Sequence, residues 1–548
     1  MDLRDSYDIV IVGAGMGGSA VAYALRQTDL SILMLERGEY VRQEQENWDP
    51  DAVIADRRYD PEEEWLDRDD CPFRPRIYYN VGGSSKLFGG TSFRFRREDF
   101  TGKRYPEGAT EPWPISYDDL APYYDEAERL MWVHGLAGAD PTEPARGDYP
   151  YEPLEHEPPI AELAARLRRL GLRPFPLPIA VHQGPGGRCR KGSPCDGFPC
   201  KIRAKGDGEN AFLRPAVRAK KDIHVVTGAT VQRLGTGKDG TRVETVVFER
   251  AGDQREVRAG TVVVAAGAAN TAALLLRSAS PSHPDGLANG SGQVGRNFMA
   301  HNNSVLMALN PLRRNPTKFQ KTLAVNDFYL AAPESAVDAA SGRPVPRSGA
   351  VPESAEKVPP GPPRTGDGAL PLGNIQMRGK VLPQNLARSA RPLVRLFRRF
   401  IAARSFDFWI MSEDLPTPEN RVEVTPDGTI RLRRELNNLE VHRVLVGTVK
   451  SYLRRAGFPF ILEREPSPGT IQHQIGTARS GRNPDRSVVD RNCRSHEVAN
   501  LYLADGSVLP SAAAVNPALT IAANALRVGE VIRRRLLSGT GEDAAAGG

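Results

Sequence analysis

Residues 7–18, with the sequence YDIVIVGAGMGG, decide the fold of this chain. The run 7–12 is almost continuously apolar, which is typical of a strand that is covered on both faces in a parallel sheet. The glycines that follow have the pattern GxGxxG, and residues 19–27 (SAVAYALRQ) predict a helix. A second predicted strand, 31–35, ends at Glu36. Together these segments predict a βαβ unit that binds a dinucleotide.

Each part of this unit has a physical reason. Gly13 permits the tight turn, Gly15 lets the backbone approach a pyrophosphate, and Gly18 lets the helix pack closely on the strand. The free N–H groups at the start of the helix favour the negative phosphates. Glu36 would accept hydrogen bonds from ribose hydroxyls and repel a 2′-phosphate. This unit alone does not distinguish FAD from NAD.

Three other segments are compatible with a cofactor. Residues 223–226 and Val231 predict strand, and 261–264 (TVVV) predicts a buried strand that enters AAGAAN and a helix over 271–277. Small residues in that turn allow a ligand to approach the backbone, although ordinary strand–helix packing explains them equally well. The segment VGGSSKLFGGT, residues 81–91, suits a backbone pressed against a flat ligand. Its aromatic flanks favour a buried loop over a surface loop.

Composition narrows the class of protein. The 548 residues carry a net charge of +6, and the arginines are scattered, whereas a nucleic-acid-binding protein concentrates basic residues in a stripe or tail. Arg94, Arg96 and Arg97 are expected to form a solvated basic face. The five cysteines are odd in number, and residues 189–200 lack a CxxC pair, so we predict neither a disulfide framework nor a metal site. With no signal peptide and no long apolar run, we expect a cytoplasmic protein without a membrane partner.

In their order along the chain, these segments resemble the glucose–methanol–choline (GMC) family of flavoprotein oxidoreductases. The resemblance runs over most of the chain and includes VGRNFMAH (294–301), HQIGT (473–477) and LYLADGSVLPSAAAVNPALTIAANA (501–525). It implies FAD and the oxidation of an alcohol to a carbonyl. The family's active-site histidine, followed by His or Asn about forty residues later, maps onto His473 and Asn516. That pair, with CDGFPC (195–200), NDFY (326–329), LGNIQ (372–376) and AVNPALT (514–520), is most similar to pyranose 2-oxidases and bacterial glycoside 3-oxidases.

The resemblance also implies roles for single residues. His473 would take the hydroxyl proton, and Asn516 would donate a hydrogen bond to the developing alkoxide. The expected substrate contacts are His301, Asn326, Gln376, His473 and Asn516. The expected FAD contacts are Gly13, Gly15, Gly18, Glu36, Gly83, Ser84, Phe88, Gly89, Gly90, Thr91, Val231, Ala266, Gly267, Asp505, Gly506, Asn516 and Pro517. Many family members have Asn where Phe88 stands. No histidine lies between residues 82 and 100, so we expect non-covalent FAD.

The expected fold class is α/β (α+β), a Rossmann-like FAD-binding domain interleaved with a substrate domain. The FAD-binding domain would comprise 1–100, 205–300 and 473–540, and the substrate domain 101–204 and 301–472. Predicted strands at 406–411, 421–424 and 429–432, the last two joined as a hairpin, suggest an antiparallel sheet that roofs the flavin; residues 439–455 predict a helix. The Pro-rich stretch 332–371 is expected to be a flexible loop or lid, and 541–548 a disordered tail.

The expected reaction is oxidation of a secondary hydroxyl of a sugar or glycoside to the keto-sugar. Position C3 of a glycoside is preferred, and C2 of a pyranose is second. Oxygen or another acceptor would reoxidise the flavin. The alternative is a GMC dehydrogenase of a non-sugar alcohol that passes electrons to a quinone or a protein. The sequence does not determine the oligomeric state.

Overall fold

The computed structural model describes residues 3–330, 364–365, 368–387 and 389–537. The expected lid at 332–371 lies mostly outside these residues, and the expected tail at 541–548 lies outside them entirely. No helix among the described residues is long and apolar enough to cross a membrane.

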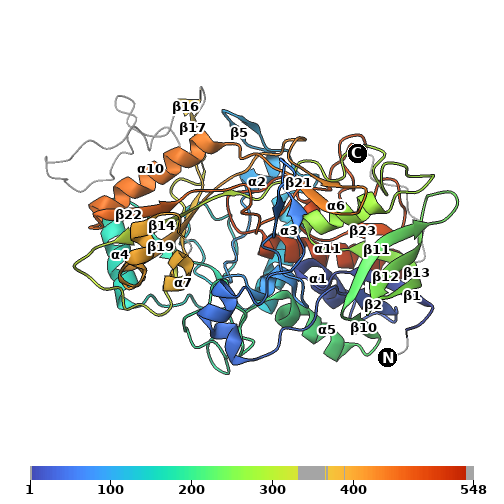
Figure 1. Ribbon diagram of the computed structural model, residues 1–548, viewed down its shortest axis with the longest axis horizontal. Coiled ribbons are helices and arrows are strands. Elements are labelled where there is room, and N and C mark those ends of the chain that lie inside the picture. Colours follow the sequence, from blue (N-terminus) through green and yellow to red (C-terminus); the bar gives the residue numbers. More distant parts are fainter. Residues whose placement is uncertain (1–2, 331–363, 366–367, 388, 538–548) are drawn as a thin grey trace.

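A seven-stranded sheet forms one end of the molecule (Figure 1). Its strand order is β10-β2-β1-β13-β12-β11, and β23 also pairs with β13. The strands are β1 (Ser6–Val12), β2 (Ile32–Leu35), β10 (Ile223–Val226), β11 (Ala229–Thr236), β12 (Val243–Arg250), β13 (Asp253–Val264) and β23 (Leu501–Leu503). The pairs among β10, β2, β1, β13 and β23 are parallel, whereas β11 and β12 form an antiparallel extension. The predicted βαβ unit is confirmed.

Helices cover this sheet because its central strands are apolar on both faces. All four residues of β2 are buried, as are the last four residues of β1. The covering helices are α1 (Met16–Ala24), α5 (Arg214–Ala219), α6 (Ala268–Arg277) and α11 (Ala518–Leu537), and α1 packs closely against α11. Segments from both ends of the chain therefore build one core.

A second sheet of six antiparallel strands lies at the other end of the molecule (Figure 1). Its order is β22-β14-β19-β18-β15-β8. The strands are β8 (Phe175–Pro176), β14 (Asn302–Leu309), β15 (Leu323–Val325), β18 (Asn374–Met377), β19 (Ser405–Ser412) and β22 (Phe460–Arg464). The predicted strand at 406–411 is confirmed as β19, and its alternating side chains point to two different environments.

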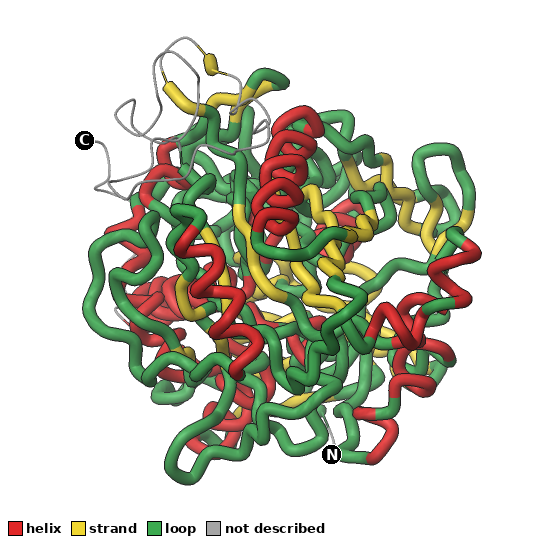
Figure 2. The backbone as a smooth tube through the Cα atoms, turned by 90° about the vertical axis from the view of Figure 1, so that its left-hand side faces the viewer, coloured by secondary structure: helices red, strands yellow, loops and turns green. Residues whose placement is uncertain are grey.

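The two faces of this second sheet have different partners. Leu306, Phe408 and Met377 pack into one apolar cluster with α4 (Pro158–Arg169) and α10 (Leu439–Arg455). Figure 2 looks at the molecule from this end, with helices in front of the strands. On the opposite face, residues such as Met411 and Trp409 line a cavity. The short helices α7 (Pro383–Ala387), α8 (Pro392–Leu396) and α9 (Arg398–Ala402) pack at the margin of that face.

The predicted hairpin forms, but it lies in a different sheet. β20 (Arg421–Val424) pairs antiparallel with β21 (Ile430–Arg433), and both join β3 (Trp65–Leu66) and β4 (Pro72–Phe73). β20 packs against α6 of the parallel sheet. The expectation that this hairpin belongs to the flavin roof was wrong, because its partner strands come from a segment almost 350 residues earlier in the chain, at 65–73.

The remaining elements are short or peripheral. They are α2 (Arg97–Thr101), α3 (Tyr117–Leu130), β5 (Arg104–Tyr105), β6 (Gly108–Ala109), β7 (Val133–His134), β9 (Ile179–Ala180), β16 (Arg364–Thr365) and β17 (Gly368–Ala369). Of these, α3 packs against α11 and so ties residues 117–130 to the parallel sheet.

Candidate active site

A cavity of about 830 Å³ lies between the two sheets. One end is lined by the glycine turn after β1, by Glu36 and by the turn after β13. The other end is lined by His473 and Asn516, and by Met411 and Trp409 of β19. The cavity therefore joins the predicted dinucleotide site to the predicted catalytic pair.

The glycine turn has the backbone geometry that a pyrophosphate requires. No side chain caps the N-terminus of α1, so its first N–H groups remain available to a ligand. A Cβ on Gly17 would lie 1.7 Å from the carbonyl oxygen of Ala504, and one on Gly83 would lie 3.0 Å from Cα of Gly15. The residues present fit a dinucleotide because two glycine turns approach each other beside the free helix end.

Glu36 stands at the end of β2, beside this turn. Its carboxylate accepts hydrogen bonds from the backbone N–H groups of Ala14, at 2.7 Å, and Gly38, at 2.9 Å. Burial raises the pKa of this carboxyl to about 7. Each oxygen retains a lone pair beyond these bonds, and the side chain lines the cavity, so it can accept a hydrogen bond from a ribose hydroxyl.

Asp505 lies at the end of β23 and organises the turn after β13. Its carboxylate accepts hydrogen bonds from the N–H of Gly267, at 2.8 Å, and from the hydroxyl of Thr271, at 2.6 Å. It also accepts from the N–H of Ser507 at 2.8 Å. The side chain therefore holds the start of α6 against β23, and both Asp505 and Gly506 line the cavity.

The other predicted FAD contacts divide into two groups. Those that line the cavity are Gly13, Gly15, Gly83, Ser84, Phe88, Gly89, Thr91, Ala266, Gly267 and Pro517. Gly18, Gly90 and Val231 are not among the lining residues. Gly18 packs against the carbonyl of Gly13, which is the close helix packing expected of it, and Val231 lies on β11. Their contact with FAD stays a prediction.

Gly89 faces an ion pair that sequence reasoning did not identify. Lys321 Nζ lies 3.0 Å from Asp196 Oδ2, and both residues line the cavity. A Cβ on Gly89 would lie 1.9 Å from this Nζ, so a larger residue here would displace the lysine from its place beside Asp196. Asp196 belongs to CDGFPC, which pointed to the branch of the family but gave no indication of this pair, because Lys321 lies 125 residues away.

The hydrogen bonds around His473 determine its tautomer. His301 Nε2 lies 2.9 Å from the carbonyl oxygen of Ala512, which can only accept, so this nitrogen carries a proton. In neutral His301 the Nδ1 atom is then an acceptor, and it lies 3.0 Å from Nδ1 of His473. His473 therefore donates from Nδ1 and keeps an unprotonated Nε2. Burial, followed by the proximity of His301, lowers the pKa of His473 to about 3.

Asn516 presents its amide nitrogen to the unprotonated Nε2 of His473. Its Nδ2 lies 3.3 Å from Nε2 of His473, and its Oδ1 accepts a hydrogen bond of 2.8 Å from Nε2 of Gln376. Asn516 precedes Pro517 and the start of α11, where proline disfavours helical geometry in the preceding residue. A base and a hydrogen-bond donor thus converge at one point of the cavity wall.

Three predicted substrate contacts lie behind the cavity wall. His301, Asn326 and Gln376 are fully buried and are not among the residues that line the cavity. His301 contacts His473, and Gln376 contacts Asn516, so both act on a lining residue. The wall itself contains Asn303, whose buried Oδ1 has no hydrogen-bond partner among the described residues. The sequence signal for Asn303 was its place two residues after His301.

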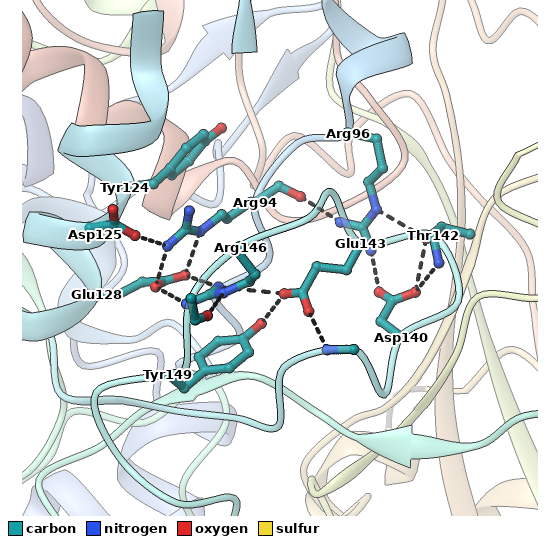
Figure 3. A network of polar contacts seen from close by, with 12 residues as sticks. Arg94, Arg96, Tyr124, Asp125, Glu128, Asp140, Thr142, Glu143, Arg146 and Tyr149 are labelled. Carbon is teal, nitrogen blue, oxygen red and sulfur yellow. Dashed lines mark hydrogen bonds and ion pairs between the residues drawn. The ribbon is translucent and has the colours of Figure 1, made fainter. Parts of the chain in front are cut away.

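Arg94 and Arg96 correct the expectation of a solvated basic face (Figure 3). Arg94 Nη2 lies 2.6 Å from Oε2 of Glu128 on α3, and Arg96 pairs with Asp140. Both arginines are buried, and only Arg97 is exposed. A cluster of arginines in the sequence indicates a basic surface only when no carboxylate pairs with them. Here the carboxylates of Glu128 and Asp140 lie 34 and 44 residues after the arginines that they contact. Among the described residues, no cluster of His, Cys, Asp or Glu could hold a metal ion.

Comparison with known proteins agrees with this geometry. Two family models described as GMC oxidoreductase match residues 7–303 and 459–525. The chain is 31% identical to a 6′′′-hydroxyparomomycin C oxidase from Streptomyces lividus, over 97% of this chain and 92% of the relative. It is 29% identical to a 2-methyl-1,2-propanediol dehydrogenase from Mycolicibacterium austroafricanum, over 97% and 96%.

The fold is also similar to that of a solved oxidase structure. The crystal structure of a pyridoxine 4-oxidase from Mesorbium loti superposes with a TM-score of 0.64 at 19% identity, over 96% of this chain and 99% of that one. The family models together cover more than half of the 548 residues. The chain belongs to the GMC oxidoreductase family and is an FAD-dependent oxidoreductase.

Proposed function

We propose that this enzyme oxidises a secondary hydroxyl of a sugar or glycoside to a ketone, with C3 of a glycoside as the first choice and C2 of a pyranose as the second. The observation that carries the proposal is the convergence of His473 Nε2 and Asn516 Nδ2, 3.3 Å apart, at the cavity wall. The unprotonated Nε2 of His473 and the N–H donor of Asn516 suit an alcohol, which must lose a proton as it loses a hydride.

His473 and Asn516 divide this task. The glycine turn and Glu36 would hold FAD, which would supply the hydride acceptor for this oxidation. The unprotonated Nε2 of His473 accepts the hydroxyl proton, and the Nδ1–H bond to His301 steadies the ring as positive charge develops. Asn516 Nδ2 donates to the oxygen as it becomes an alkoxide, a stabilisation that grows toward the transition state.

Two features of the cavity support a sugar. Trp409 contributes an aromatic side chain to the wall, and Asn303 supplies a buried carbonyl oxygen that can accept from a hydroxyl. The 31% identical relative is named for a hydroxyparomomycin, and the proposal carries its sugar-like substrate class to this chain. The alternative is a dehydrogenase of a non-sugar alcohol with a quinone or protein acceptor, which the 29% identical propanediol dehydrogenase favours.

Anaerobic reduction of the flavin tests the proposal. The purified protein is mixed without oxygen with a panel of free pyranoses, glycosides and simple alcohols such as 2-methyl-1,2-propanediol, and the flavin absorbance is followed. We expect glycosides to bleach the flavin fastest, and NMR of the product to locate the ketone. Bleaching by simple alcohols alone would reject the sugar proposal in favour of the alternative.

Two further measurements complete the test. Readmitting oxygen shows whether oxygen reoxidises the flavin or an artificial quinone is needed. Acid precipitation then tests non-covalent FAD, since we expect all of the flavin to remain in the supernatant. Flavin in the pellet would contradict that expectation.

A further inference from the structure

A row of buried amides leads away from Asn516 into the second sheet. Gln376 donates through Nε2 to Asn516 Oδ1 at 2.8 Å and to Asn374 Oδ1 at 3.0 Å, and its Oε1 accepts from the hydroxyl of Thr91 at 3.0 Å. Gln376 and Asn374 lie two residues apart on β18, so both side chains point to the same face. Gln376 Nε2 also lies 3.0 Å from Met411 Sδ, so the hydrogen bonds of the Gln376 amide are all made inside the protein.

The row continues to a buried carboxylate. Asn374 Nδ2 donates to Asn326 Oδ1 at 2.6 Å, and Asn326 Nδ2 donates to Asp140 Oδ2 at 2.6 Å. Arg96 pairs with the same carboxylate, which also accepts from the N–H and the hydroxyl of Thr142. Asn326, Asn374 and Gln376 are completely buried. We call Asp140, Asn326, Asn374 and Gln376 the amide relay.

The carboxylate gives the relay one direction. An ionised carboxylate can only accept, so Asn326 must present its nitrogen to Asp140 and its oxygen to Asn374. Asn374 must then present its nitrogen to Asn326 and its oxygen to Gln376. Gln376 must in turn present its nitrogen to both amide oxygens. Reversing any one amide would place two acceptors or two donors in contact among fully buried side chains.

We propose that the amide relay sets the orientation of Asn516 and so keeps its Nδ2 toward His473 and the substrate oxygen. Gln376, Asn374 and Asn326 are then positioning residues, which act through Asn516 rather than on the substrate. This inference rests on the proposed role of Asn516 as a donor, but it does not depend on which alcohol is oxidised. It predicts that position 376 needs a donor toward Asn516, whereas position 374 needs both an acceptor toward Gln376 and a donor toward Asn326.

Two amide-to-acid variants separate these requirements. In Gln376→Glu only a protonated carboxyl can donate to Asn516 Oδ1, and burial raises the pKa of such a carboxyl. We expect kcat near the wild-type value at about pH 5 and a fall of about tenfold by about pH 8, with KM nearly constant. In Asn374→Asp the acceptor toward Gln376 remains, but only a protonated carboxyl can donate to Asn326 Oδ1. We therefore expect kcat to fall with rising pH in the same direction but by less, because Asn374 contacts Gln376 rather than Asn516.

Two apolar variants and one control complete the set. Gln376→Leu removes the hydrogen bond to Asn516, and Asn374→Leu removes the hydrogen bond to Gln376. Both should lower kcat about tenfold at every pH. Asn524→Asp on α11 is the matched control, because this buried amide contacts Arg527 and Cys493 and lies outside the relay. A pH profile of Gln376→Glu that parallels the wild type would overturn the relay. So would a lower kcat for Asn374→Asp than for Asn374→Leu at about pH 5, where the protonated carboxyl can make both relay contacts.

The relay and the proposed function can fail separately. If no sugar bleaches the flavin but another alcohol does, the same kcat profiles are measured with that alcohol. If no alcohol does, the infrared carboxyl band of Gln376→Glu still tests the relay. We expect a protonated carboxyl at about pH 5, above the ordinary pKa of a glutamate, because Asn516 Oδ1 requires a donor there. An ionised carboxylate would show that Asn516 has turned its amide and would overturn the proposal.

Discussion

The two ends of the cavity are built in different ways. The glycine turn at residues 13–18 is contiguous in sequence and leads into α1, whose first N–H groups no side chain caps. The catalytic end consists of two side chains 43 residues apart, His473 and Asn516, whose protons are placed by His301 and Gln376 behind them. The glycine turn should therefore lose its function when a larger side chain is introduced. The catalytic end should lose activity when the hydrogen-bond partners of His473 and Asn516 are removed or reversed.

The largest expected effect is at the glycine turn. In Gly17→Ala the new Cβ would lie 1.7 Å from a backbone carbonyl oxygen, which cannot move aside without separating β23 from α1. We expect loss of bound FAD and of cooperative thermal unfolding, measured by flavin absorbance per protein and by calorimetry. The matched control is Gly447→Ala in α10, where a Cβ meets nothing within 4 Å and should stabilise the helix by about 0.5–1 kcal/mol. Normal flavin content in Gly17→Ala would contradict this account.

At the catalytic end, removing the base should abolish chemistry and spare the cofactor. We expect His473→Gln to bind FAD normally and to slow anaerobic flavin reduction by about 10²- to 10⁴-fold. His182→Gln is a suitable control, because this half-buried histidine stacks on Trp132 and does not line the cavity. Reduction at the wild-type rate in His473→Gln would reject it as the base.

A smaller effect is expected at His301, which lies behind His473 and does not line the cavity. His301→Phe removes the acceptor of His473 Nδ1–H, so the ring loses the partner that selects its tautomer. We expect flavin reduction to slow by about 10- to 100-fold, and His301→Gln, which keeps an acceptor, to recover part of the loss. Equal rates in the wild type and His301→Phe would show that His473 does not need this partner.

The same comparison explains what the sequence could predict. The βαβ unit was predictable because its strand, glycines and Glu36 are neighbours in the chain, and each follows a local rule. His473 and Asn516 were accessible through family motifs. The sequence placed His301 and Gln376 among the substrate contacts, but it could not predict their hydrogen bonds to His473 and Asn516, which lie 172 and 140 residues away in the chain.

The same limit applied to Arg94 and Arg96, whose buried ion pairs depend on Glu128 and Asp140. Local pattern described this cluster of arginines correctly as basic but could not supply their partners. The hairpin at β20–β21 was correct as a local structure and wrong in its sheet, for the same reason. Sequence therefore predicted the elements, whereas long-range pairing decided which side chains act together.

The smallest expected effect is an absence of pH dependence. Burial and His301 lower the pKa of His473 to about 3, so Nε2 stays unprotonated well below neutral pH. We expect the rate of flavin reduction to change less than about twofold between about pH 8 and about pH 5, where a solvated histidine would be half protonated near 6.5. Stability, unlike the rate, should depend on pH in this range. Burial lowers the pKa of His442 to about 4, so the unfolded chain binds a proton at this histidine at a higher pH than the folded chain does. The free energy of unfolding should therefore fall as the pH drops from about 6.5 toward 4. The rate should therefore be measured by rapid pH jump on folded enzyme, and a midpoint near 6.5 would show that His473 is solvated.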